Sequence, residues 1–159
     1  MKQLIQAASI LVITALTAVN VVAAEPSDAL ATAALSTETR TLLIQEMQAI
    51  TEAMGRIHTA VVTGDHATVV EEARDIHDSF VLAQKLTDAQ RTEIAATLPA
   101  AFVAADRAFH GLAGNLMHAG EQGNPELERF WLQEMTRACQ ACHKEHASAR
   151  FPGLAPQGQ

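Results

Sequence analysis

Apolar residues recur every three or four positions along most of the chain, a spacing typical of amphipathic helices. In the first run the gaps alternate between four and three positions, through Leu43, Met47, Ile50, Met54, Ile57 and Val61. Ser36 is suited to the start of this helix and Gly64 to its end. After a cap at Asp65, a second run continues through Val69, Ala73, Ile76, Phe80 and Ala83. The pattern predicts two helices joined by a short turn.

Two more long helices follow a short helical segment expected over 89–97. Pro99 opens a helix whose apolar face is Phe102, Ala105, Phe109, Leu112, Leu116 and Ala119. Pro125 opens the last helix, which carries Leu127, Trp131, Met135, Ala138 and Cys142 and fades after Ala149 into a loose tail. No stretch alternates with period two, so no strand is expected. The pattern predicts an all-α protein, an antiparallel four-helix bundle formed by one domain over residues 25–159.

The first 24 residues have a different character. Lys2 precedes an apolar run over 4–24 that ends in small residues before Glu25. This order is typical of a secretory signal peptide cleaved after Ala24. An uncleaved membrane anchor is the alternative, because the run is long enough to span a bilayer. Polar residues within the run favour cleavage, so we expect export to a bacterial periplasm and no membrane association of the mature chain.

The composition of the chain argues against several classes of protein. The chain has 159 residues, of which 48% are hydrophobic, and this fraction excludes a disordered protein. A formal net charge of −7 argues against a nucleic-acid partner. Two cysteines are too few for a disulfide scaffold. Only 4% of the residues are aromatic, so either aliphatic side chains alone fill the core or a group that the sequence does not encode helps to fill it.

One motif carries the chemistry. The segment Cys139-Gln140-Ala141-Cys142-His143 is C-x-x-C-H, the signature of covalent c-type haem attachment. Two thiols add to the vinyl groups of haem, and the adjacent histidine coordinates the iron. A thioredoxin-like redox pair, a zinc site with His146, and a plain disulfide are the alternatives. The histidine after the second cysteine and the export signal favour haem c.

The position of the motif, after three helices, resembles the cytochrome c-prime and cytochrome c-556 family. The resemblance runs from about Thr39 to Arg150 and includes Gly55-Arg56, the Gly64-Asp65 turn, Phe102 and Ala108-Phe109. It implies an exported antiparallel four-helix bundle with haem covalently bound on the C-terminal helix. It also implies that His143 is the proximal axial ligand and that a homodimer forms through the first two helices.

The resemblance places Met47 over the open face of the haem. Family members with methionine there can have six-coordinate iron and carry electrons, whereas those with an aliphatic residue bind nitric oxide or carbon monoxide. A thioether suits low-spin iron and raises its reduction potential. We therefore expect a monohaem cytochrome that carries single electrons between redox partner proteins, with His/Met ligation. A five-coordinate, gas-binding protein is the alternative, and Met47 is then only a core residue.

Other polar residues are expected to have ordinary roles. No nucleophile–base pair or phosphate-binding loop points to an enzyme. His146 stands where the family usually has an aromatic residue, and Ala147 stands where it has an arginine near the proximal histidine. Arg150 is the nearest substitute for that arginine. Arg40 and Arg56 are candidates to neutralise haem propionates, although solvated arginines are commoner.

Overall fold

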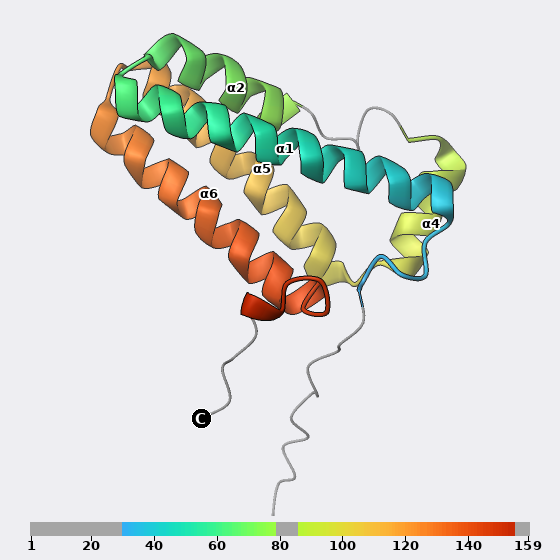
Figure 1. The fold of residues 1–159 in the computed structure, drawn as a ribbon. Coiled ribbons are helices and arrows are strands. Elements are labelled where there is room, and N and C mark those ends of the chain that lie inside the picture. The colour runs from blue at the N-terminus through green and yellow to red at the C-terminus, as the bar shows by residue number, and fades with distance from the viewer. Residues whose placement is uncertain (1–29, 79–85, 155–159) are drawn as a thin grey trace, which may run out of the picture.

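The computed structural model describes residues 30–78 and 86–154, and within them it has helices and no strand (Figure 1). The α-helices are α1 (Thr37–Thr63), α2 (His66–Asp78), α4 (Asp88–Thr97), α5 (Ala100–Glu121) and α6 (Pro125–His146). A 3-10 turn, η1 (Pro152–Leu154), follows them. The predicted all-α class is confirmed for these residues. The predicted signal peptide and the positions Phe80 and Ala83 lie outside the described residues.

The helices begin and end where local chemistry predicts. Ser36 caps α1 by accepting a hydrogen bond from the backbone N–H of Thr39. Gly64 ends α1 in the left-handed region, at φ 73°, which favours glycine. Asn124 caps α6 just before Pro125, and its side chain accepts from two backbone N–H groups. Within the described ranges, no helix is both long enough and apolar enough to cross a bilayer.

The four long helices form a helical bundle in which α2 packs against α1 and α5, and α5 packs against α6 (Figure 1). Close approach of α2 and α5 depends on glycine, since a Cβ at Gly120 would lie 2.8 Å from Val70. The turns after α1 and α5 lie at the same end, where His66 Nδ1 is 2.7 Å from Glu128 Oε1. The main core lies near this end and is mostly aliphatic, with Phe109 at its far side.

A second, smaller core lies at the opposite end, between α4 and the start of α1. It consists of Leu35, Leu43, Leu86, Ile94 and Leu98. Glu93 of α4 accepts hydrogen bonds from the hydroxyls of Ser36 and Thr39. These contacts fix the start of α1 at the end of the bundle where α6 finishes.

The buried face of α1 differs in part from the predicted one. Leu43, Ile50 and Ile57 are buried as predicted, but the positions between them are filled by Glu46, Ala53 and Ala60 rather than by Met47, Met54 and Val61. The face turns toward α2, whose Glu72 pairs with Arg56 of α1. Met54 and Val61 pack at the edge of the core, and Met47 is 39% exposed.

The end of α6 also differs from the predicted one, because the helix stops at His146 and not after Ala149. The carbonyl of His146 accepts a 2.9 Å hydrogen bond from the N–H of Ala31, and this bond replaces helical pairing. The following residues are not a loose tail as far as Leu154. The N–H of Phe151 donates to the carbonyl of Ala147, and the turn brings the chain back against α6.

Candidate functional site

The C-x-x-C-H motif lies within regular helix, in the last two turns of α6. Met135, one turn earlier, is fully buried, and Cys139, Cys142 and His143 follow it at i+4, i+7 and i+8. These offsets place all three side chains on the inward side of α6. The two cysteines are partly buried and are not joined in a disulfide. Cys139 packs against the main core.

Burial keeps both thiols protonated. It raises the pKa of Cys139, and it raises the pKa of Cys142 to about 11, with a smaller contribution from the negative charge of Asp106. Catalytic redox cysteines have a lowered pKa because the thiolate is the reactive species. The surroundings of this pair therefore do not resemble those of a thioredoxin-like centre.

His143 is held as a neutral imidazole. Partial burial lowers the pKa of its ring, so the ring carries no charge at neutral pH. It stacks on Phe151, with centroids 4.2 Å apart and an interplanar angle of 7°. A neutral, oriented imidazole is the form that coordinates a metal. The sequence did not reveal the stacking partner, because Phe151 lies in the segment that was expected to be loose.

Met47 lies on the flank of α1 that faces away from α2. With 3.6 residues per turn, it shares that flank with Met54 and Val61, roughly opposite Arg56, which contacts α2. The packing of α1 on α6 is limited to a short stretch, and the two helices separate toward the start of α1 (Figure 1). Met47 is 39% exposed on this flank.

Helix lengths bring Met47 level with the motif. Both helices are measured from the end where α1 finishes and α6 begins. Met47 is 16 residues before Thr63, or about 24 Å along α1 at 1.5 Å per residue. Cys139 and His143 are 14 and 18 residues after Pro125, or about 21 and 27 Å along α6.

The other candidate residues have structural contacts. Arg40 donates to the backbone carbonyls of Thr32, Ala33 and Leu35, and Arg56 is engaged with Glu72. Neither of the two arginines is placed by the structure to neutralise a group beside the motif. His146 is 8% exposed and meets Phe102 edge-on at 5.5 Å, which fastens the end of α6 to the start of α5. Arg150 is exposed.

A buried ionic cluster beside the motif was not predicted. His110 Nε2 is 3.8 Å from Asp106 Oδ1 and 3.9 Å from Glu46 Oε1, and all three side chains are less than a tenth exposed. Asp106 also influences Cys142 electrostatically. The signal was present in the sequence, because Asp106 and His110 are one turn apart and flank the predicted apolar positions Ala105 and Phe109.

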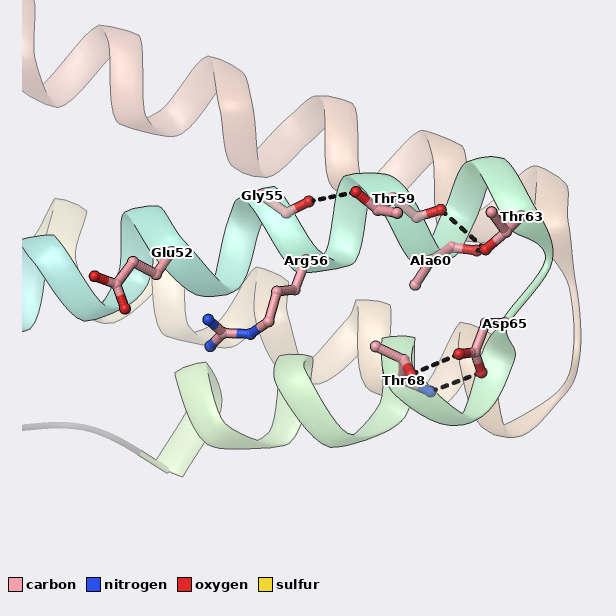
Figure 2. Close-up of a pocket in the computed structure, with 8 residues that line it drawn as sticks. All are labelled: Glu52, Gly55, Arg56, Thr59, Ala60, Thr63, Asp65 and Thr68. Atoms are coloured by element: carbon pink, nitrogen blue, oxygen red, sulfur yellow. Dashed lines mark hydrogen bonds between the residues drawn. The ribbon is translucent and has the colours of Figure 1, made fainter.

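A surface groove of about 530 Å³ lies between α1 and α2 (Figure 2). Arg56 lines it and is roughly opposite Met47 around α1. Its walls include Gly55, Thr59 and Ala60, and its polar groups have local partners, such as Asp65 with Thr68. These are the two helices of the predicted homodimer, which stays a prediction.

The donors present fit haem c. Two protonated thiols at i and i+3 and a neutral imidazole at i+4 share one side of α6, and attachment of haem needs one protein nitrogen on the iron. A structural zinc site needs four protein ligands. Residues 30–78 and 86–154 contain no cluster of three His, Cys, Asp or Glu side chains that could hold a metal ion. Comparisons with protein-family models, curated proteins and solved structures find no match.

Proposed function

We propose that the protein is an exported monohaem c-type cytochrome that carries single electrons. One observation carries the proposal: Cys139, Cys142 and His143 lie on the inward side of α6 with protonated thiols and a neutral imidazole. These are the protonation states that thioether formation and axial coordination use. Haem c would supply a one-electron couple that this chain otherwise lacks.

The residues of the chain have separate tasks in this proposal. Cys139 and Cys142 tether the haem, and His143 provides the proximal axial nitrogen. Phe151 holds the imidazole plane through its stacking contact. The helices keep water from the inner edge of the site, since Met135 and Phe109 are buried beside it.

The position of Met47 favours electron transfer rather than gas binding as the function. Two observations support this: the helix lengths bring Met47 level with the motif, and its side chain is 39% exposed and so is not fixed in the core. We propose it as the distal axial ligand, which favours a six-coordinate, low-spin iron. The alternative is a five-coordinate cytochrome c-prime that binds nitric oxide or carbon monoxide, and it applies if Met47 does not reach the iron.

The remaining features complete the proposal. The helical bundle is of the antiparallel four-helix type, with α4 as an accessory helix. The segment 1–24 is a cleaved signal peptide, and the mature chain works in the periplasm with redox partner proteins. Its charge after cleavage is −8, because Lys2 is lost from the −7 of the whole chain.

The decisive test is covalent haem attachment. The full chain is expressed in bacterial cells with and without the periplasmic haem-attachment apparatus, and the purified product is weighed by mass spectrometry. We expect the mass of the chain from Glu25 onward plus one haem, which should survive denaturation. A matched variant with Cys139→Ala and Cys142→Ala should lack the added mass. A haem-free wild-type protein from competent cells would overturn the proposal.

A further inference from the structure

The proposed function does not use the Asp106–His110 pair of α5. The two side chains are one helical turn apart, 9% and 4% exposed, with His110 Nε2 3.8 Å from Asp106 Oδ1. No described residue hydrogen-bonds to the buried Oδ2 of Asp106. A carboxyl group and an imidazole in such surroundings are costly to keep unless they serve a purpose or share a proton.

The hydrogen-bond partners of His110 distinguish its two ring nitrogens. His110 Nδ1 is 2.6 Å from the backbone carbonyl of Ile76, and a carbonyl oxygen only accepts, so Nδ1 carries a hydrogen. Nε2 is then the ring nitrogen that faces the carboxylates of Asp106 and Glu46. The pair is therefore a proton site inside the bundle and not a surface histidine.

Titratable groups reach this pair from several helices. Glu46 of α1 lies 3.9 Å from Nε2, Arg107 adjoins Asp106 on α5, and α6 contributes Cys142. From α2 the contact is the neutral carbonyl of Ile76, and His77 lies beyond it against Gly114. Burial raises the pKa of Asp106, while the positive charges of His110 and Arg107 oppose that shift.

We propose that the Asp106–His110 pair takes up one proton when the protein accepts an electron, so that this cytochrome couples proton uptake to electron transfer. The inference rests on the proposed function. The link between the two sites is Asp106. It is 15 residues before Glu121, or about 23 Å along α5, and Cys142 is 17 residues after Pro125, or about 26 Å along α6, so the two residues lie level on helices that pack together. Cys142 would be joined to the haem, and the negative charge of Asp106 already acts on this residue.

The step balances in charge and atoms. One electron comes from a one-electron donor protein, or from an electrode in the test, and converts ferric to ferrous iron. One proton comes from water and stays on the pair as a new N–H or O–H bond. The added negative charge favours protonation nearby because screening by solvent is weak in the bundle interior.

This coupling determines in which direction the midpoint potential changes with pH. Protonation of the pair is stronger in the reduced protein, so the midpoint potential falls as pH rises through the range between the two titrations. At full coupling, one pH unit changes the redox equilibrium tenfold, or about 59 mV for one electron.

The test compares midpoint potentials of holoprotein between pH 5 and pH 9 by spectroelectrochemistry. Asp106→Asn keeps the shape of the side chain but removes its charge, and it should flatten the slope or move it by more than one pH unit. Glu128→Gln is the matched control, because Glu128 is fully buried beside His66 yet lies about 21 Å along α6 from Cys142. It should leave the wild-type curve unchanged.

A second readout does not depend on the potential. Proton uptake on reduction is measured with a pH indicator in weakly buffered solution, for wild type, Asp106→Asn and His110→Gln. We expect close to one proton for wild type at the middle of the slope and a clear loss in either variant. A pH-independent wild-type potential, or an Asp106→Asn curve identical to wild type, would overturn the inference while haem attachment stands. A chain without haem would overturn the proposed function instead.

Discussion

The imidazole of His143 and the ring of Phe151 lie nearly parallel, 4.2 Å apart. A residue eight positions after the motif therefore sets the plane of the predicted proximal ligand. Phe151→Ala should release that plane and broaden the electron paramagnetic resonance signal of the oxidised holoprotein. It should also lower the free energy of unfolding by about 1 kcal/mol, the usual worth of an aromatic pair.

The matched control for this change is Phe130→Ala. Phe130 is exposed and pairs edge-on with Trp131, on α6 but away from the motif. The Phe130→Ala substitution removes an aromatic ring of the same size, so stability should change similarly while the electron paramagnetic resonance signal stays the same. Equal signals in wild type and Phe151→Ala would show that stacking does not orient the ligand.

Met47→Ala tests the sixth coordination position. The oxidised spectrum should change from low-spin to high-spin, and the reduced protein should then bind carbon monoxide rapidly. Because Met47 is 39% exposed, stability should change by only about 0.5 kcal/mol. Ile44→Ala, at a similarly exposed position on α1, should leave the spectrum as it was. An unchanged spectrum in Met47→Ala would remove Met47 as ligand.

Glu93 should make stability depend on pH. Hydrogen bonds from Thr39 and Ser36 lower the pKa of this carboxyl below its ordinary 4.5. The contribution is therefore complete above pH 4.5 and is lost as pH falls through the folded-state value. Thermal unfolding between pH 3 and pH 7 should show this loss in wild type and less of it in Glu93→Gln. Glu71→Gln, on the exposed side of α2, should behave as wild type, and parallel curves for all three would contradict the assignment.

The buried thiols should react slowly before haem is attached. With a pKa of about 11, Cys142 has about one thousandth of its thiols ionised at pH 8. Alkylation of the haem-free chain by iodoacetamide should be much slower than in denaturant, where both cysteines regain ordinary values. Rapid reaction in the native chain would show that α6 does not bury the motif.

Helix positions could be predicted because local chemistry decides them. Caps at Ser36 and Asn124, the glycine turn at Gly64 and the apolar periodicity act over a few residues. The side of α1 that is buried could not be predicted in full. Met47 and Glu46 are adjacent, and Glu46 is the buried one, where it lies beside His110 of α5. That choice depends on a neighbouring helix and not on the pattern of α1 itself.

In the candidate site, too, the local motif could be read from the sequence, whereas the contacts across the fold could not. The motif alone singles out Cys139, Cys142 and His143, and the structure brings them to one side of α6. That they bind haem stays a prediction. Contacts across the fold were not predictable. Phe151 stacks on His143 after a turn in which its N–H donates to the carbonyl of Ala147, and buried His110 has its partner, the carbonyl of Ile76, on α2.

The absorption spectrum of the purified holoprotein in both oxidation states tests the central claim most directly. Covalently bound haem with His/Met ligation should give low-spin spectra in both states, with the weak far-red band of methionine-bound ferric iron. Spectra without haem c bands would contradict the cytochrome assignment. High-spin spectra with rapid carbon monoxide binding would keep the haem but contradict electron transfer through a His143–Met47 centre.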